Sequence, residues 1–368
     1  MSTAATLRSH AALCAAQPQL TRIAPLGTLV ADLPARTLVH AGPPFASLGD
    51  VPLPVRNAAA AALEFEGWSE AGWAAIAAQE IHFAPAQDFG IVTPLAFVAS
   101  PSMFGVEVID AAGKTPAKVS PLNDGPPAIA LRFGTANAEG LALVESLANG
   151  IGDDLASGLR GPVPLLPLMA DALANGDDLH GNVAAMQTAI RARFTGLSPR
   201  SEAYLDAAGQ FALNIVMAAA AVMLAAGDGV EDSAMVVTCG GNGRDVGWKL
   251  AGGGGWRTAP AQRPEGPHAE GTVPLPAIGD SAVIDALGFG AAALRFAPAL
   301  SANLPDLPPA FLTAAAHDAY IGPHPAFPAD VALGLDLTRA RKVLGIMLGM
   351  VEETGTRGLI GRGVAPWP

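Results

Sequence analysis

The densest group of polar residues in the sequence is Gly-Asp-Asp-Leu-His-Gly-Asn at 176–182, immediately before an apolar segment. On a helix, Asp177 and His180 share a face, because residues three or four apart are neighbours. A histidine held beside a carboxylate is a common general base or proton shuttle. The alternative is helix capping, in which Asp177 or Asp178 accepts hydrogen bonds from the free N–H groups of the first turn. Capping explains the aspartates but does not require His180 or Asn182.

Further polar candidates lie where turns follow apolar runs. His40 ends a short apolar run before Gly-Pro-Pro, and loops at such positions often hold ligand groups, although a structural histidine is an equal explanation. Asn242 and Arg244 share an Asn-Gly-Arg-Asp turn that offers an amide and a cation. The alternative there is a hairpin turn with solvated charges. Asp280 lies in a Gly-Asp-Ser turn and is a candidate for substrate binding.

Asn214 lies in the run 211–226, which is otherwise composed of apolar residues. Burying an unpaired amide costs roughly 1–3 kcal/mol, so Asn214 should have a partner, either structural or ligand. The run is shorter than the ~20 residues that span a bilayer, which favours a buried helix. The sequence therefore predicts no membrane partner.

The secondary-structure elements that position these residues can be predicted from the spacing of apolar residues, which changes along the chain. Its 368 residues exceed what one hydrophobic core usually organises. Residues 1–155 contain short apolar runs between Gly, Pro and Asn turns, residues 156–232 have long Ala/Leu/Met stretches with helical spacing, and residues 233–368 return to strand-like runs. We therefore predict a multidomain protein of mixed α/β, or α+β, class with a central, mainly helical domain.

Several single elements can be predicted more closely. Ser198-Pro199 begins a helix that carries Asn214 in its interior and ends at 227–229. A last helix runs from near Leu337 through Met350, and the glycine-rich segment 355–363 forms a loop. The strands expected in the N-terminal region are 91–100, 104–109 and 128–133.

Composition excludes several classes of function. A formal charge of −12, with 21 basic residues, argues against a nucleic-acid partner. The two cysteines have no metal or disulfide spacing, no other metal motif is present, and we expect neither a metal nor a cofactor. The first residues lack a continuous apolar core, so a cytoplasmic protein is expected. Gly-Phe-Gly-Ala-Ala-Ala at 288–293 has the form of a dinucleotide fingerprint, but a tight turn into a closely packed helix explains the same glycines.

The order and spacing of eight segments resemble the YahG/YlbE-like family of bacterial ureide-catabolism proteins. The segments are LVHAGPP at 38–44, LEFEGW at 63–68, LNDGPPAIALRFG at 122–134, GDDLHGN at 176–182, GQFALN at 209–214, GGNGRDVG at 240–247, GDSAVIDALGFGAAAL at 279–294 and GLDLTRARKVLGI at 334–346. The resemblance implies a cytoplasmic α/β protein and a subunit of a carbamoyl-transferring enzyme similar to oxamate carbamoyltransferase. Such an enzyme converts oxalurate and phosphate to oxamate and carbamoyl phosphate. The implied partners are a small anionic ureide, phosphate and companion subunits in a homo- or hetero-oligomer.

Carbamoyl transfer develops negative charge on an oxygen and handles two anions, so it calls for Arg and backbone donors. Under this hypothesis His40 and His180, with Asp178, polarise the carbonyl or transfer a proton. Arg132 is the candidate carboxylate clamp, because guanidinium matches carboxylate geometry. The remaining substrate-binding candidates are Asn182, Asn214, Asn242, Arg244 and Asp280.

The chain departs from the family in being shorter and in having Gly241 where an Arg is usual, which removes one candidate anion clamp. Two alternatives to the transferase are a non-catalytic scaffold or binding subunit and a stand-alone ureide or amide hydrolase. The enzyme hypotheses require His40, His180, Asn242 and Arg244 to converge, whereas the scaffold hypothesis leaves them dispersed.

Overall fold

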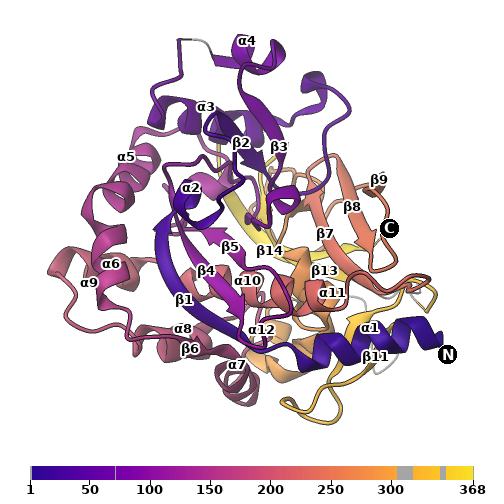
Figure 1. Ribbon diagram of the computed structural model, residues 1–368. Helices are drawn as coiled ribbons and strands as arrows, with labels where there is room; N and C mark the ends of the chain where they lie inside the picture. Colours follow the sequence, from indigo (N-terminus) through magenta and orange to yellow (C-terminus); the bar gives the residue numbers. More distant parts are fainter. Residues whose placement is uncertain (1, 71, 305–317, 340–344, 368) are drawn as a thin grey trace.

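The computed structural model describes residues 2–70, 72–304, 318–339 and 345–367 (Figure 1). It confirms the predicted class, a multidomain protein of mixed α+β architecture. Two four-stranded antiparallel sheets, a parallel strand pair and two hairpins are joined by helices. The boundaries at residues 155 and 232 stay predictions.

The first sheet has the strand order β5-β4-β1-β6. Its strands are β1 (Pro18–Pro25), β4 (Phe104–Asp110), β5 (Lys118–Pro121) and β6 (Val163–Pro164). The second sheet has the order β10-β7-β8-β9. Its strands are β7 (Val236–Asn242), β8 (Asp245–Leu250), β9 (Arg257–Pro260) and β10 (Ile278–Gly279).

Three strand pairs complete the β structure. The parallel pair is β2 (Thr37–His40) with β3 (His82–Pro85), and the hairpins are β11 (Tyr320–Pro323) with β12 (Ala332–Leu335) and β13 (Gly345–Val351) with β14 (Leu359–Pro366). The α-helices are α1 (Ala4–Ala15), α2 (Leu26–Leu29), α3 (Leu53–Phe65), α4 (Gly72–Ala77), α5 (Ala138–Ser146), α6 (Gly152–Gly158), α7 (Leu165–Ala174), α8 (Ala184–Arg191), α9 (Pro199–Ala207), α10 (Phe211–Ala226), α11 (Ala282–Leu287) and α12 (Pro298–Ala302).

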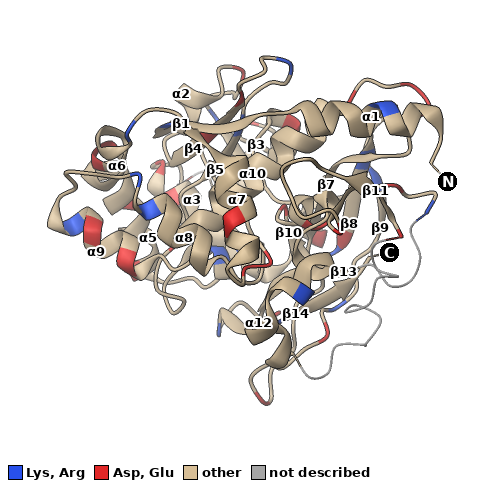
Figure 2. Cartoon of the chain, turned by 90° about the horizontal axis from the view of Figure 1, so that it is seen from below, with Lys and Arg blue, Asp and Glu red and all other residues tan. Residues whose placement is uncertain are grey.

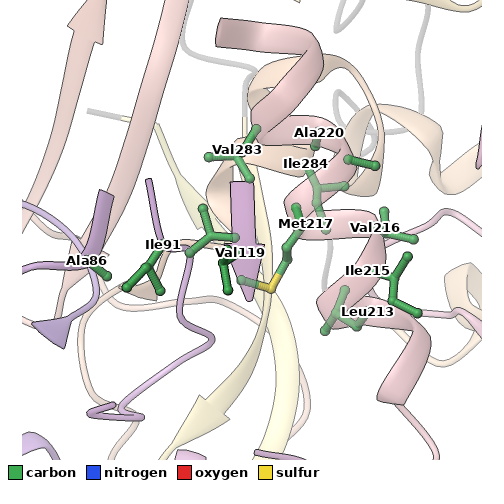
Figure 3. Close-up of a cluster of buried hydrophobic side chains, with 14 of the residues drawn as sticks. Ala86, Ile91, Val119, Leu213, Ile215, Val216, Met217, Ala220, Val283 and Ile284 are labelled. Carbon is green, nitrogen blue, oxygen red and sulfur yellow. The ribbon is translucent and has the colours of Figure 1, made fainter. Parts of the chain in front are cut away.

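Helix α10 is the centre of the core. It contacts β4 and β5 of the first sheet, β7 of the second sheet, and α1, α8 and α11 (Figure 1). Every residue from Phe211 to Leu224 is buried, and the helix carries no charged residue, in contrast to the neighbouring α9 (Figure 2). Met217 of α10 reaches toward Val119 of β5 (Figure 3). The predicted burial of this helix is therefore confirmed.

No single helix among the described residues is long and apolar enough to cross a membrane. Only α9 and α10 taken together meet the length and composition criteria, and the two are bent by 73°. This bend corrects the prediction of one continuous helix from Ser198 to Gly227. The side chain of Ser198 caps α9 as predicted, but the helix ends at Ala207. The break at 208–210 is stabilised by the backbone N–H of Gln210, which donates to Asp124 Oδ2 at 2.6 Å.

Other element predictions are corrected as well. Strand β4 is confirmed, but 91–100 has only isolated bridges and 128–133 forms a turn and a short 3-10 helix. The predicted helix 337–350 falls partly on 340–344, outside the described residues. Its remainder from Gly345 is strand β13, and the predicted loop 355–363 enters β14. An apolar run buried on both faces has no period that distinguishes a strand from a helix.

Asp280, at the junction of β10 and α11, forms hydrogen bonds with residues far from it in the chain. Its fully buried carboxylate accepts hydrogen bonds from the N–H of Gly42 (2.8 Å), the N–H of Thr93 (2.9 Å) and Gln87 Nε2 (2.7 Å). Burial raises the pKa of Asp280 to about 7, against the opposing effect of these donors. Gly240 packs so closely against this carboxylate that a Cβ there would clash with it. The contacts give Asp280 a structural role between the N-terminal and C-terminal regions.

Replacing Asp280 with Ala should lower the free energy of unfolding by at least about 3 kcal/mol, because several buried donors lose their acceptor at once. Asp280→Asn keeps one carbonyl oxygen and should cost less. Urea unfolding measures both, with Asp228→Ala as an exposed control. A free energy for Asp280→Ala within about 1 kcal/mol of the wild type would contradict this role.

Candidate functional site

The segment 176–182 forms a loop, not a helix, so the predicted sharing of a helix face by Asp177 and His180 is wrong. The buried Asp178 carboxylate accepts the backbone N–H groups of His180 (3.2 Å), Gly181 (3.1 Å) and Asn182 (2.6 Å). Burial raises the pKa of Asp178, and these donors act against that rise. The Asp178 side chain thus shapes the loop that presents His180.

Asp177 has the capping role that the alternative interpretation gave it. Its carboxylate accepts the N–H groups of Ala185 (3.1 Å) and Met186 (2.8 Å) in the first turn of α8. The two aspartates therefore use the backbone donors of the loop and of the helix start. A ligand cannot rely on those donors.

His180 pairs with Asp285 of α11, a residue that sequence reasoning misses. The distance from Nδ1 to Asp285 Oδ2 is 2.7 Å, and both side chains are buried. The other oxygen, Oδ1, accepts the N–H groups of Ala291 (2.9 Å) and Met347 (3.1 Å). A carboxylate on Nδ1 fixes the tautomer and leaves Nε2 for chemistry. Among the described residues, nothing hydrogen-bonds to Nε2 of His180.

Gly290 explains the apparent dinucleotide motif. The motif follows α11, a helix, so it lacks the strand that a nucleotide-binding turn requires. Gly290 has φ of +60°, its N–H donates to the Asp178 carbonyl at 2.9 Å, and a Cβ there would clash with Asp285 Oδ1. The tight-turn interpretation is confirmed, because the glycine lets the Asp178 loop approach Asp285.

A cavity of about 300 Å³ opens beside His180. This volume is at the lower end of the range for small-molecule sites. Its polar lining comes from five separate parts of the chain, and it consists of Asp124, Arg132, His180, Asn182, Gln210, Ser281 and Arg362. Of the predicted site residues, the structure thus brings together Arg132, His180 and Asn182.

The two terminal nitrogens of Arg132 are engaged inside the protein, while its buried Nε has no described partner. Its Nη2 forms an ion pair with Asp124 Oδ1 at 2.5 Å and a hydrogen bond to Gln210 Oε1 at 3.2 Å. The guanidinium also lies 4.8 Å from the centre of the Phe133 ring. Burial raises the pKa of Asp124, while Arg132 acts to lower it. Arg132 therefore brings its own counter-charge to the cavity wall.

Asn214 has a structural partner behind this wall. Its Oδ1 accepts a hydrogen bond from Asn123 Nδ2 at 2.9 Å, and Asn123 Nδ2 also donates to the Pro121 carbonyl. Asn123 Oδ1 lies 3.5 Å from Arg132 Nη1. Asn214 is thus linked through Asn123 to Arg132, and it does not line the cavity.

His40 lies elsewhere, in an aromatic cluster. Its ring is 4.7 Å from the centre of Phe45 and 4.6 Å from that of Phe83, and its Nδ1 is 2.9 Å from the Ala41 carbonyl oxygen. Burial lowers the pKa of His40 to about 4. His40 is a neutral, packed histidine that does not line the cavity.

Asn242 and Arg244 also lie outside the cavity. Asn242 Oδ1 accepts the N–H groups of Arg244 (2.9 Å) and Asp245 (2.8 Å), so it stabilises the hairpin turn between β7 and β8. The Arg244 side chain is 63% exposed and lies 3.4 Å from an oxygen of Asp50. Gly241 pairs with β10, where a Cβ would clash with a carbonyl, so no side chain fits there. The four residues His40, His180, Asn242 and Arg244 do not converge, so the site that the enzyme hypotheses required is not formed by them, and any catalytic role must rest on His180 with other neighbours.

Arg362 of β14 also lines the cavity, and sequence reasoning misses it, as it misses Asp124, Gln210 and Ser281. Arg362 lies in the glycine-rich segment that predicts a loop, so nothing in the pattern marks it. Pairing of β14 with β13 brings it to the cavity. Within the described part of the chain, no three His, Cys, Asp or Glu side chains group in a way that could hold a metal ion.

Comparison with known proteins places these residues in context. Residues 81–281 match the family described as oxamate carbamoyltransferase subunit AllG. The oxamate carbamoyltransferase subunit AllG of Escherichia coli K12 is 29% identical over 308 residues, which cover 78% of this chain and 73% of that protein. The uncharacterized protein YahG of the same organism is 29% identical over 295 residues, covering 74% of this chain and 61% of YahG.

A crystal structure of a conserved protein of unknown function from Enterococcus faecalis V583 has the same fold. Its TM-score is 0.90 at 23% identity, and the match covers 99% of this chain and 94% of that one. The family range contains Arg132, His180 and Asn182 but ends before Asp285 and Arg362. The fold similarity extends over all of them.

Gly290→Ala should lower the free energy of unfolding by about 1–3 kcal/mol, because a methyl group overpacks against the Asp285 carboxylate. Gly229→Ala is a matched control, since Gly229 also has positive φ (+77°) but has no atom within 4 Å of the added methyl group. Chemical denaturation compares the two variants. Equal losses would show that backbone strain, and not the contact with Asp285, accounts for the effect.

The buried His40 should make the protein acid-sensitive. Its pKa is about 4 in the folded protein and near its ordinary 6.5 in the unfolded chain. The unfolded state therefore binds more protons between these values, so stability is complete above pH 6.5 and falls toward pH 4. The slope from this residue is at most about 1.4 kcal/mol per pH unit.

His40→Phe keeps the aromatic packing without titrating, so its unfolding free energy should fall less between pH 7 and pH 5 than that of the wild type. The exposed His268→Phe serves as the control. Parallel curves for His40→Phe and the wild type would refute the assignment.

Proposed function

The chain belongs to the AllG family of oxamate carbamoyltransferase subunits, and on this premise we propose that it is a catalytic subunit of a carbamoyl-transferring enzyme of ureide catabolism. Its substrates in this proposal are oxalurate and phosphate, and its products are oxamate and carbamoyl phosphate. Companion subunits complete the enzyme, as the word subunit in the name of the E. coli relative suggests. The reaction takes place in the cavity beside His180.

The observation that carries the proposal is the His180–Asp285 pair at the wall of a small cavity that also contains two arginines. Asp285 holds the Nδ1–H tautomer, so Nε2 is the ring atom able to accept a proton. A histidine held in this way is suited to general acid–base chemistry.

In the proposed step, a phosphate oxygen forms a bond to the carbamoyl carbon of oxalurate, and the bond from that carbon to the oxamate nitrogen breaks. His180 Nε2 takes the proton that phosphate releases and delivers it to the departing nitrogen. The negative charge of Asp285 stabilises the transient imidazolium. Atoms and charge balance without a metal or a cofactor in this scheme.

A second candidate is a non-catalytic scaffold subunit. It is favoured by the dispersal of His40, Asn242 and Arg244, each of which has a structural explanation away from the cavity. A stand-alone ureide or amide hydrolase would use the same His180–Asp285 pair with water in place of phosphate. The three candidates predict different effects of His180 variants and of the companion subunits on the rate of the reaction.

The test is carbamoyl phosphate formation from oxalurate and phosphate by the chain assembled with its companion subunits. His180→Asn should lower the rate by about 10²- to 10⁴-fold through loss of proton transfer. Asp285→Asn should lower it as well, because an amide no longer fixes the tautomer of His180. The exposed His268→Asn should leave it unchanged.

Wild-type rates for His180→Asn in the assembled enzyme would establish the scaffold instead. Release of carbamate or ammonia by the chain alone, with no need for phosphate, would establish the hydrolase.

A further inference from the structure

Two arginines line the cavity, and only one of them is free. Arg132 is neutralised by Asp124 and held by Gln210. Arg362 is half-buried, and within the described residues its guanidinium has neither an ion pair nor a hydrogen bond. A cation taken out of water without a counter-charge is costly, so this arrangement calls for an anion from outside the chain.

The surroundings of Arg362 leave room for such an anion. Its direct partner on the neighbouring strand β13 is Gly349, so no side chain stands opposite it in the hairpin. Arg362, Asn182 and Leu359 also line a second hollow, of about 510 Å³, on the α12 side. Arg362 thus lies at the wall between two hollows.

The charges and the burial around Arg362 act on its pKa in opposite directions. Burial lowers the pKa of the Arg362 guanidinium below its ordinary value, Asp178 raises it and Arg132 lowers it. The Asp178 carboxylate accepts three backbone N–H groups and acts on Arg362 through its charge, without an ion pair or hydrogen bond to it among the described residues. A bound anion would relieve the desolvation of Arg362 and its repulsion from Arg132.

The donors of the segment 180–186 are already occupied. The backbone N–H groups from His180 to Asn182 donate to Asp178, and those of Ala185 and Met186 donate to Asp177. Asn182 Nδ2 donates to the Gly176 carbonyl at 2.9 Å, which leaves its Oδ1 as an acceptor for a ligand N–H. Ser281 and Gln210 add neutral donors to the lining, and Arg362 is the cation there without a described counter-ion, so an anionic ligand should depend on Arg362 most.

We propose that Arg362 is the specificity-determining residue of this cavity and binds the carboxylate of the ligand, while Asn182 Oδ1 accepts an amide N–H of the same ligand. The assignment rests on the proposed function for the identity of the probe, and it transfers the role of carboxylate clamp from Arg132 to Arg362. Guanidinium binds a carboxylate through two parallel hydrogen bonds.

A carboxylate suits this position better than phosphate does. Buried Asp124 lines the cavity beside the two arginines, and buried Asp178 and Asp285 lie behind its wall in contact with the His180 segment. Phosphate carries more negative charge at neutral pH than a carboxylate does, so these aspartates oppose it more strongly. One unpaired guanidinium, beside a loop whose backbone donors already bind Asp177 and Asp178, matches a singly charged group.

The test is calorimetric binding of oxamate to the full-length chain. Arg362→Met should weaken binding by at least about 10-fold, because a charged hydrogen-bonded pair is lost, and Arg362→Lys should fall between this variant and the wild type. Arg257→Met removes an exposed cation on β9 and should bind oxamate like the wild type. Pyruvate has a methyl group in place of the NH2 group of oxamate, so it should bind the wild type more weakly. Arg362→Met should weaken the binding of pyruvate by the same factor as that of oxamate.

Thermal unfolding separates a binding role from a structural one. Because Arg362 has no described partner to lose, Arg362→Met should unfold at the same temperature as the wild type or higher. A lower unfolding temperature for Arg362→Met, or unchanged oxamate affinity, overturns the proposal. Weakening of inorganic phosphate binding alone, or no binding of oxamate by the wild type, overturns it as well.

These outcomes are distinct from the test of the proposed function. If oxamate binding depends on Arg362 but the assembled enzyme forms no carbamoyl phosphate, the proposed reaction fails and the binding assignment stands. If the enzyme turns over and Arg362→Met binds oxamate normally, only the binding assignment fails.

Discussion

Burial of α10 is the constraint on which the rest of the structure depends. Because the helix is enclosed from Phe211 to Leu224, both large sheets and three other helices must present apolar surfaces to it. Its many alanines let these elements approach closely, and close packing makes such positions sensitive to small changes in volume. The single amide on it, Asn214, has its Oδ1 satisfied by Asn123, while its buried Nδ2 has no described partner. Asn123 also contacts Arg132, so it connects the core to the cavity wall.

The geometry around His180 is held by groups from distant parts of the chain. Asp178 sets the loop, Gly290 allows α11 to approach it, and Asp285 orients the ring. Asp285 is itself fixed by the N–H of Met347 on β13. Side chains locked in this way lose little freedom when a ligand binds, which is what precise positioning of a reacting group requires.

The sequence could predict the features that depend only on residues close together in the chain. Ser198-Pro199 marks a helix start by its own chemistry, and the composition of 211–226 indicates a buried helix whatever surrounds it. The break before Phe211 could not be predicted, because it depends on Asp124, 86 residues away from Gln210. The His180–Asp285 pair joins residues 105 apart, so no spacing rule identifies it. The polar cluster at 176–182 did predict His180 and Asn182 at the cavity, whereas isolated residues such as His40 and Arg244 have structural surroundings.

The position of the β13–β14 hairpin has a consequence for biosynthesis. Met347 N–H, which fixes Asp285, and Arg362, which lines the cavity, both belong to this hairpin. The loop, α10 and α11 are all made earlier, so a ribosome-bound chain could bury its central helix long before its cavity was complete. The order of synthesis therefore separates the formation of the core from the formation of the site. A nascent chain that lacks the hairpin has neither the Met347 N–H that Asp285 accepts nor Arg362 at the cavity wall.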